Sequence, residues 1–164
     1  MKIMAVVCHP ADAIDGAGGT LCLHAERGDD VTVVVCTHGV ETHDLRRNDA
    51  VRFAVREAAE QSQAISGKER EVVEGLGILG VRQVRFLRFS DELFIVTREV
   101  VEALASAMAQ IQPDLLILHN PTEERGLADI GHADSAIATL KAKTLANSLF
   151  TQTPDFQKAT ARMT

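Results

Sequence analysis

Histidine and aspartate side chains beside apolar runs are the residues of this chain best suited to chemistry. Five of the six histidines lie in the segments that follow such runs, and only His24 falls inside a helical pattern; the five are His9, His38, His43, His119 and His132. His9 and Asp12 lie three residues apart on a turn that contains Pro10. Imidazole nitrogen and carboxylate oxygen form a mixed donor set that suits Zn²⁺ or another divalent metal. The spacing indicates a metal site, although a turn whose side chains cap the next helix explains it equally.

Glycines follow this turn at positions 16, 18 and 19. Glycine lets the backbone approach a ligand closely, and a helix N-terminus favours anions. Gly18 and Gly19 are therefore candidate substrate-binding residues. A dinucleotide-binding turn is the competing interpretation, but the G-x-G-x-x-G spacing is absent and no acidic residue closes a second strand.

Four apolar runs rich in β-branched residues predict the strands that position these groups. They cover residues 2–8, 31–36, 83–87 and 115–118. Each run is nearly continuous in apolar residues, as in a parallel sheet covered on both faces. Helical patterns lie between and after them, at residues 18–27, roughly 49–79 with an interruption near Ser66 and Gly67, 97–111 and 133–148.

Strands that alternate with helices predict an α/β fold with a doubly wound, mainly parallel sheet and helices on both faces. Ligands of such sheets bind at the carboxyl ends of the strands. The segments to search are therefore 8–19, 37–44, 88–91 and 119–134. The length predicts one domain over residues 1–150, and residues 151–164 are predicted to be a loose tail.

Composition excludes several classes of function. The net charge of −6 and the pI near 5.5 argue against nucleic acid or an acidic membrane surface as a partner. Three scattered cysteines indicate reduced thiols rather than a disulfide framework. The apolar run that ends at Cys8 is too short for a secretory signal or a membrane span. These features predict a cytoplasmic protein with a small-molecule substrate.

Several motifs together resemble the PIG-L/LmbE-like family of zinc-dependent N-deacetylases. The resemblance begins with His9-Pro10-x-Asp12, Gly18-Gly19-Thr20-Leu21 and VTVVVCTHG, and it continues through Leu79-Gly80-Val81, the strand before Asp91, His119-Asn120-Pro121 and the segment around His132. It covers the chain to about residue 145. It implies a Rossmann-like fold and the removal of acyl groups from amino-sugar derivatives and related amides.

The resemblance implies His9 and Asp12 as two zinc ligands. The third ligand of the family is the second histidine of a later His-x-x-His segment, where this chain has one histidine. One alignment puts Ser135 at the ligand position, and the other puts His132 there with Asp129 at the position of the first histidine. The second alignment gives a His/Asp/His set that leaves a coordination position open, as a catalytic zinc site needs.

The resemblance also shows a departure at the general base. The family has an aspartate directly after the proline, where this chain has Ala11, and the neighbouring acidic position is Ala13. Removal of a general base costs roughly 10²–10⁴ in rate unless another group substitutes. The candidates are Asp15, Asp129, Asp134, His38 and His43. Asp91 corresponds to a family residue near the sugar and is a candidate substrate-binding residue.

Two functions follow from these patterns. The first is a zinc-dependent hydrolase of C–N bonds that acts on an N-acetylated amino sugar. The second is a pseudoenzyme that binds metal or ligand without hydrolysis, which Ala11 and Ala13 favour. Family members continue well past the helix at His132. The chain is thus expected to be a minimal or truncated member, or one whose site a partner subunit completes, for example in a homo-oligomer.

Overall fold

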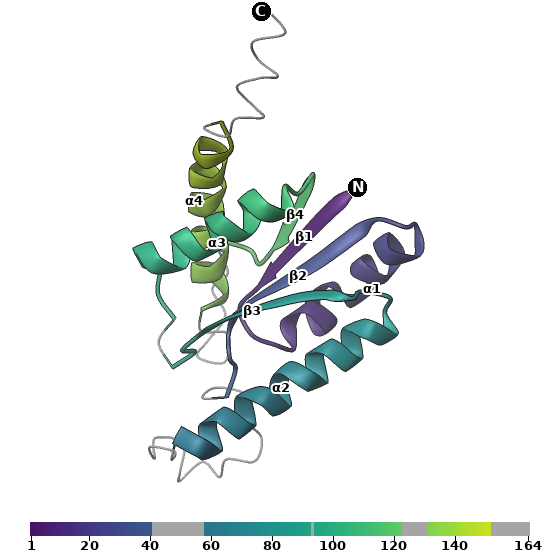
Figure 1. Ribbon diagram of the computed structural model, residues 1–164, viewed down its shortest axis with the longest axis vertical. Coiled ribbons are helices and arrows are strands. Elements are labelled where there is room, and N and C mark those ends of the chain that lie inside the picture. Colours follow the sequence, from purple (N-terminus) through teal and green to yellow (C-terminus); the bar gives the residue numbers. More distant parts are fainter. Residues whose placement is uncertain (41–57, 93, 123–130, 152–164) are drawn as a thin grey trace, which may run out of the picture.

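A four-stranded parallel sheet forms the centre of the computed structural model, which describes residues 1–40, 58–92, 94–122 and 131–151 (Figure 1). Its strands are β1 (Lys2–Val7), β2 (Asp30–Thr37), β3 (Gln83–Phe89) and β4 (Leu115–Leu118). Their order is β3-β2-β1-β4, and all three pairings are parallel. All four predicted strands are therefore confirmed, because continuous apolar runs suit a sheet that is buried on both faces.

Helices cover both faces of this sheet, as predicted. The four helices are α1 (Asp12–Glu26), α2 (Ala58–Ile78), α3 (Arg98–Ile111) and α4 (His132–Thr151). Ile3, Ala5 and Val7 of β1 pack with α1 and α2, whereas Met4, Val6 and Cys8 pack with α3 and α4. This alternation follows from the two-residue period of a strand. The doubly wound α/β fold is thus confirmed (Figure 1).

Helix α1 begins six residues earlier than the sequence predicted. The Asp12 carboxylate accepts the backbone N–H of His9 at 2.7 Å, which stabilises the first turn. Gly18 is tolerated within the helix because it packs closely against Leu79, which directly follows α2, where a Cβ would lie 3.3 Å from Leu79 Cδ1. Gly18 and Gly19 therefore lie inside α1, so the predicted helix start at Gly18 is wrong, whereas their role in substrate binding stays a prediction.

Two other predicted boundaries change. Helix α2 continues without interruption through Ser66 and Gly67, where the Ser66 hydroxyl donates to the carbonyl of Ser62 at 3.0 Å. Helix α4 extends through Thr151, which was predicted to begin the tail. The predicted helical residues 49–57 and the rest of the tail, 152–164, lie outside the described residues.

The strand order places a topological switch point between β1 and β4. The chain passes from β1 to β2 and β3 on one side and then returns to β4 on the other. In open parallel sheets, ligands bind outside the carboxyl ends of the strands at such a point. His9 lies two residues after the end of β1, and His119 directly follows β4. The fold therefore brings these two histidines to the same place.

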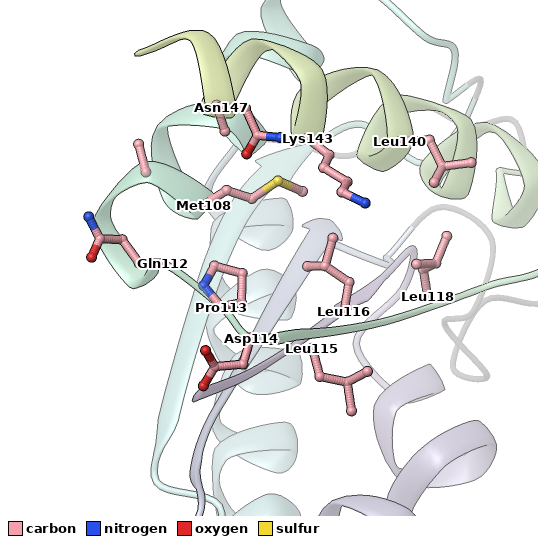
Figure 2. A pocket seen from close by; sticks show the side chains of 12 residues that line it. Met108, Gln112, Pro113, Asp114, Leu115, Leu116, Leu118, Leu140, Lys143 and Asn147 are labelled. Carbon is pink, nitrogen blue, oxygen red and sulfur yellow. The ribbon is translucent and has the colours of Figure 1, made fainter. Parts of the chain in front are cut away.

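A groove with both apolar and polar lining residues runs along β4, between this strand and helices α3 and α4 (Figure 2). Its volume is about 530 Å³, and its walls include Leu115 and Leu116 of β4, Met108 of α3, and Leu140 and Lys143 of α4. Leu115 and Leu140 are 37% and 45% exposed. No residue of the histidine cluster lines the groove. Among the described helices, none combines the length and apolar character that crossing a membrane would need.

Candidate metal centre

Three donor atoms converge at the switch point. His9, Asp12 and His132 each offer one atom, and these atoms all lie within 4.8 Å of one another. His9 Nδ1 lies 3.3 Å from His132 Nε2, and Asp12 Oδ2 lies 3.4 Å from His9 Nδ1 and 3.3 Å from His132 Nε2. Two imidazole nitrogens and a carboxylate oxygen fit a divalent metal, Zn²⁺ in particular. The arrangement leaves room for further ligands because three protein donors do not complete a tetrahedron.

Each donor is positioned by the end of a regular element. His9 follows β1 and is buried, Asp12 is the first residue of α1, and His132 is the first residue of α4. The side chains of Asp12 and His132 are 14% and 12% exposed, so the centre is partly accessible to solvent. Gly131 permits the approach of α4, because a Cβ there would lie 2.8 Å from Cys8 Sγ.

Replacing Gly131 with alanine is expected to destabilise the protein and to weaken metal binding together. Gly131 has a φ of 95°, where a Cβ costs about 1–2 kcal/mol. The overlap with Cys8 and Phe94 adds about 1–3 kcal/mol and displaces the start of α4. Gly28→Ala is the matched control, because Gly28 has a φ of 81° and open space around its Cβ position. Urea unfolding and zinc titration measure both effects; equal losses in the two variants would contradict the packing role of Gly131.

The surroundings of Asp12 keep its carboxyl ionised. Burial by itself would raise the pKa of this carboxyl, but hydrogen bonds from His119, His132 and His9 outweigh burial and hold the pKa well below its usual range. A metal-binding carboxylate must be deprotonated, so this electrostatic environment suits the role of a ligand.

His119 is a residue of the site that the sequence analysis missed. It was grouped with the other strand-end histidines but received no role. Its Nε2 lies 3.2 Å from Asp12 Oδ2 and 3.2 Å from the backbone nitrogen of Cys8. Its ring stacks on His132 with centroids 4.0 Å apart. His119 thus contacts two candidate ligands from outside, as residues that orient metal ligands do. The sequence feature that could have indicated this role is the position of His119 directly after β4, the strand that pairs with β1.

Cys8 and Cys36 are buried thiols, as the sequence indicated. Cys8 Sγ lies 3.6 Å from His9 Nε2, on the side of the ring away from the donor cluster. Burial raises the pKa of the Cys8 thiol far above its usual range, with smaller contributions from Cys36 and from nearby carboxylates. Burial also raises the pKa of Cys36 to about 12. Burial therefore favours the protonated form of both thiols in the metal-free protein.

The other predicted site residues differ in burial and in the contacts that they make. Asp15 is exposed in the first turn of α1, and Asp134 is half-buried in the first turn of α4. Asp91 is fully buried, and its Oδ1 lies 2.9 Å from His38 Nδ1. The hydroxyl of Ser135 donates to the backbone carbonyl of His132 at 2.7 Å. Asp129 and His43 lie outside the described residues.

Fold and site together define an α/β domain with a candidate catalytic metal centre at the carboxyl edge of a parallel sheet. Residues 4–143 match the family PIG-L, described as GlcNAc-PI de-N-acetylase, and the chain belongs to this family.

Relatives with assigned reactions add detail. The 1D-myo-inositol 2-acetamido-2-deoxy-alpha-D-glucopyranoside deacetylase of Rhodococcus erythropolis is 30% identical, over 88% of this chain and 55% of the relative. N,N′-diacetylchitobiose deacetylase from Pyrococcus horikoshii superposes with a TM-score of 0.72 at 21% identity, over 98% of this chain and 54% of that one. The 4-carboxy-2-hydroxymuconate hydratase from Pseudomonas putida KT2440 superposes with a TM-score of 0.70 at 23% identity, over 89% and 57%. These two superpositions show the fold, and the chain spans about half the length of these relatives.

Proposed function

We propose that this protein is a metal-dependent hydrolase of C–N amide bonds that removes the acetyl group from an N-acetylated amino sugar. The proposal rests mainly on one observation. In this member of the PIG-L family, the donor atoms of His9, Asp12 and His132 lie within 4.8 Å of one another at the switch point of the sheet. The proposed cofactor is Zn²⁺ held by these three residues, because their donor set is one that zinc prefers.

Bound zinc would supply a Lewis acid that polarises the carbonyl of the amide. The residues of the chain hold and orient the centre: Asp12 contributes the negative charge, and His119 fixes the position of its carboxylate. Of the carboxylates predicted to transfer protons, Asp134 fits best, because it is half-buried and shares the first turn of α4 with His132. Asp15 is exposed to solvent, which makes it a weaker candidate.

The proposed substrate class rests on the relative that is 30% identical, which is a deacetylase of an amino-sugar derivative. The fold alone does not decide the reaction, because a hydratase shares it. A pseudoenzyme that retains metal is the less favoured alternative, because the family and the named relatives are enzymes.

Zinc-loaded protein is expected to release acetate from an N-acetylated amino sugar, and a chelator is expected to abolish this release. A suitable panel contains N-acetylglucosamine, N,N′-diacetylchitobiose and N-acetylglucosaminyl inositol, with enzymatic acetate detection. Readdition of zinc should restore the rate, which controls for unfolding by the chelator. Protein that binds one zinc per chain but releases no acetate from any of the three would contradict deacetylation of this substrate class and favour the pseudoenzyme.

A further inference from the structure

A buried histidine and aspartate form a pair beside the metal centre without belonging to it. His38 follows β2 and is 7% exposed, and Asp91 follows β3 and is fully buried. His38 Nδ1 lies 2.9 Å from Asp91 Oδ1. A carboxylate with no exposure to water is costly unless it is paired and hydrogen-bonded. The contact with His38 therefore stabilises the buried carboxylate and fixes how the two side chains lie relative to each other.

The strand register brings this pair next to the metal loop. β1 and β2 pair in parallel with a constant register. If this register is continued past the ends of the two strands, His38 lies opposite Pro10. The backbone N–H and the hydroxyl of Thr37 both donate to the carbonyl of Cys8 at 2.9 Å, so the register does continue. Gly39 lies directly against Pro10, since a Cβ at Gly39 would overlap the proline ring.

Cys8 is a shared neighbour of the pair and the metal centre. Its thiol lies 3.6 Å from His9 Nε2, and the charges of both Asp12 and Asp91 act on it. The strand register and the Gly39–Pro10 contact thus place His38 beside Pro10, which lies on the turn between the proposed ligands His9 and Asp12. A carboxylate general base would stand on this same turn if Ala11 were an aspartate.

The pairing fixes which nitrogen of His38 carries the proton. The backbone N–H of Val40 also faces Nδ1, but at 3.5 Å, whereas Asp91 Oδ1 is at 2.9 Å. The shorter contact to a carboxylate requires an N–H donor at Nδ1. In the neutral imidazole Nε2 then carries the lone pair, as in a histidine general base that an aspartate orients.

We propose that His38, held in this tautomer by Asp91, is the general base that stands in for the carboxylate absent at Ala11; this inference rests on the proposed deacetylation. Nε2 accepts a proton from the attacking water while the water oxygen bonds to the acetyl carbonyl carbon. The same proton then passes to the amide nitrogen as the C–N bond breaks. The products are acetic acid and the free amine of the sugar, so atoms and charges balance. Asp91 acts as a positioning residue.

His38→Gln is expected to lower kcat by about 10²–10⁴ while zinc stoichiometry stays at that of the wild type. KM should change little, because the base acts on water rather than on substrate binding. His24→Gln is the matched control, because His24 forms a similar pair with Asp29 at 2.7 Å, next to the N-terminus and near the amino-terminal ends of the strands, far from the proposed centre. Undiminished kcat in zinc-loaded His38→Gln would overturn the inference, whereas zinc-loaded wild type without acetate release would instead contradict the proposed function.

Nitrogen NMR of the histidine rings in the wild type tests the inference by a readout other than activity. In zinc-loaded wild type, His38 should show a protonated Nδ1 and a lone pair at Nε2, and its ring resonances should move on zinc addition while those of His24 stay unchanged. Asp91→Asn should shift the proton away from Nδ1 and lower kcat with KM unchanged. A proton on Nε2 of neutral His38 in the wild type, or resonances that ignore zinc, would overturn the role as base.

Discussion

Asp12→Asn is expected to lower zinc affinity by more than about 100-fold and to abolish acetate release, because loss of a direct ligand should exceed the 10–100-fold cost of losing an outer partner. The variant removes the negative charge of the donor set and places an amide amid three imidazoles that hydrogen-bond to the carboxylate. Competition with a chromophoric chelator measures the affinity.

Asp15→Asn is the control for this prediction. Asp15 lies in the same first turn of α1 and carries the same charge, but its side chain is exposed and outside the donor cluster. It should keep wild-type zinc affinity and wild-type rate. If the two variants lost zinc affinity equally, the effect would come from the general charge of the helix start, and Asp12 would not be a ligand.

His132→Ala is expected to be nearly as damaging, whereas Ser135→Ala should leave zinc binding close to that of the wild type. His132 Nε2 lies within 3.3 Å of both other donors, while the Ser135 hydroxyl is engaged with a backbone carbonyl. Removal of His132 leaves two donors, too few for a stable zinc site. Isothermal titration with zinc, with circular dichroism to confirm folding, distinguishes the two variants.

The opposite pattern would contradict this assignment. Zinc retained by His132→Ala and lost by Ser135→Ala would mean that the segment aligns with the family in the other register, with Ser135 at the ligand position. A loss in both variants together with lower helicity would point to the first turn of α4, and His132→Gln then separates folding from ligation because the side chain stays polar and of similar length.

Local patterns predicted most of the fold. The strands were found because a buried parallel sheet needs continuous apolar runs, and β4 was placed at its observed bounds. The start of α1 was missed because Gly16, Gly18 and Gly19 lower helix propensity, which tertiary packing against α2 overrides. The continuous course of α2 through Gly67 has the same cause, since packing of an amphipathic helix outweighs one unfavourable residue.

The site was predictable only where its residues are close in sequence or match a family motif. His9 and Asp12 share one turn, and His132 came from the family alignment. The part played by His119 depends on β4 lying beside β1, which the order of strands along the chain does not reveal. The His38–Asp91 contact depends on the register of β2 and β3 at their ends, so Asp91 was predicted to face a substrate although its carboxylate is buried against His38.

Anomalous diffraction from crystals of the zinc-loaded protein, measured above the zinc absorption edge, locates the metal directly. We expect one strong peak per chain, bonded by His9 Nδ1, Asp12 Oδ2 and His132 Nε2 at about 2.0–2.2 Å. Protein that is saturated with zinc in solution but shows its peak on other residues, with nothing between these three atoms, would contradict the metal centre.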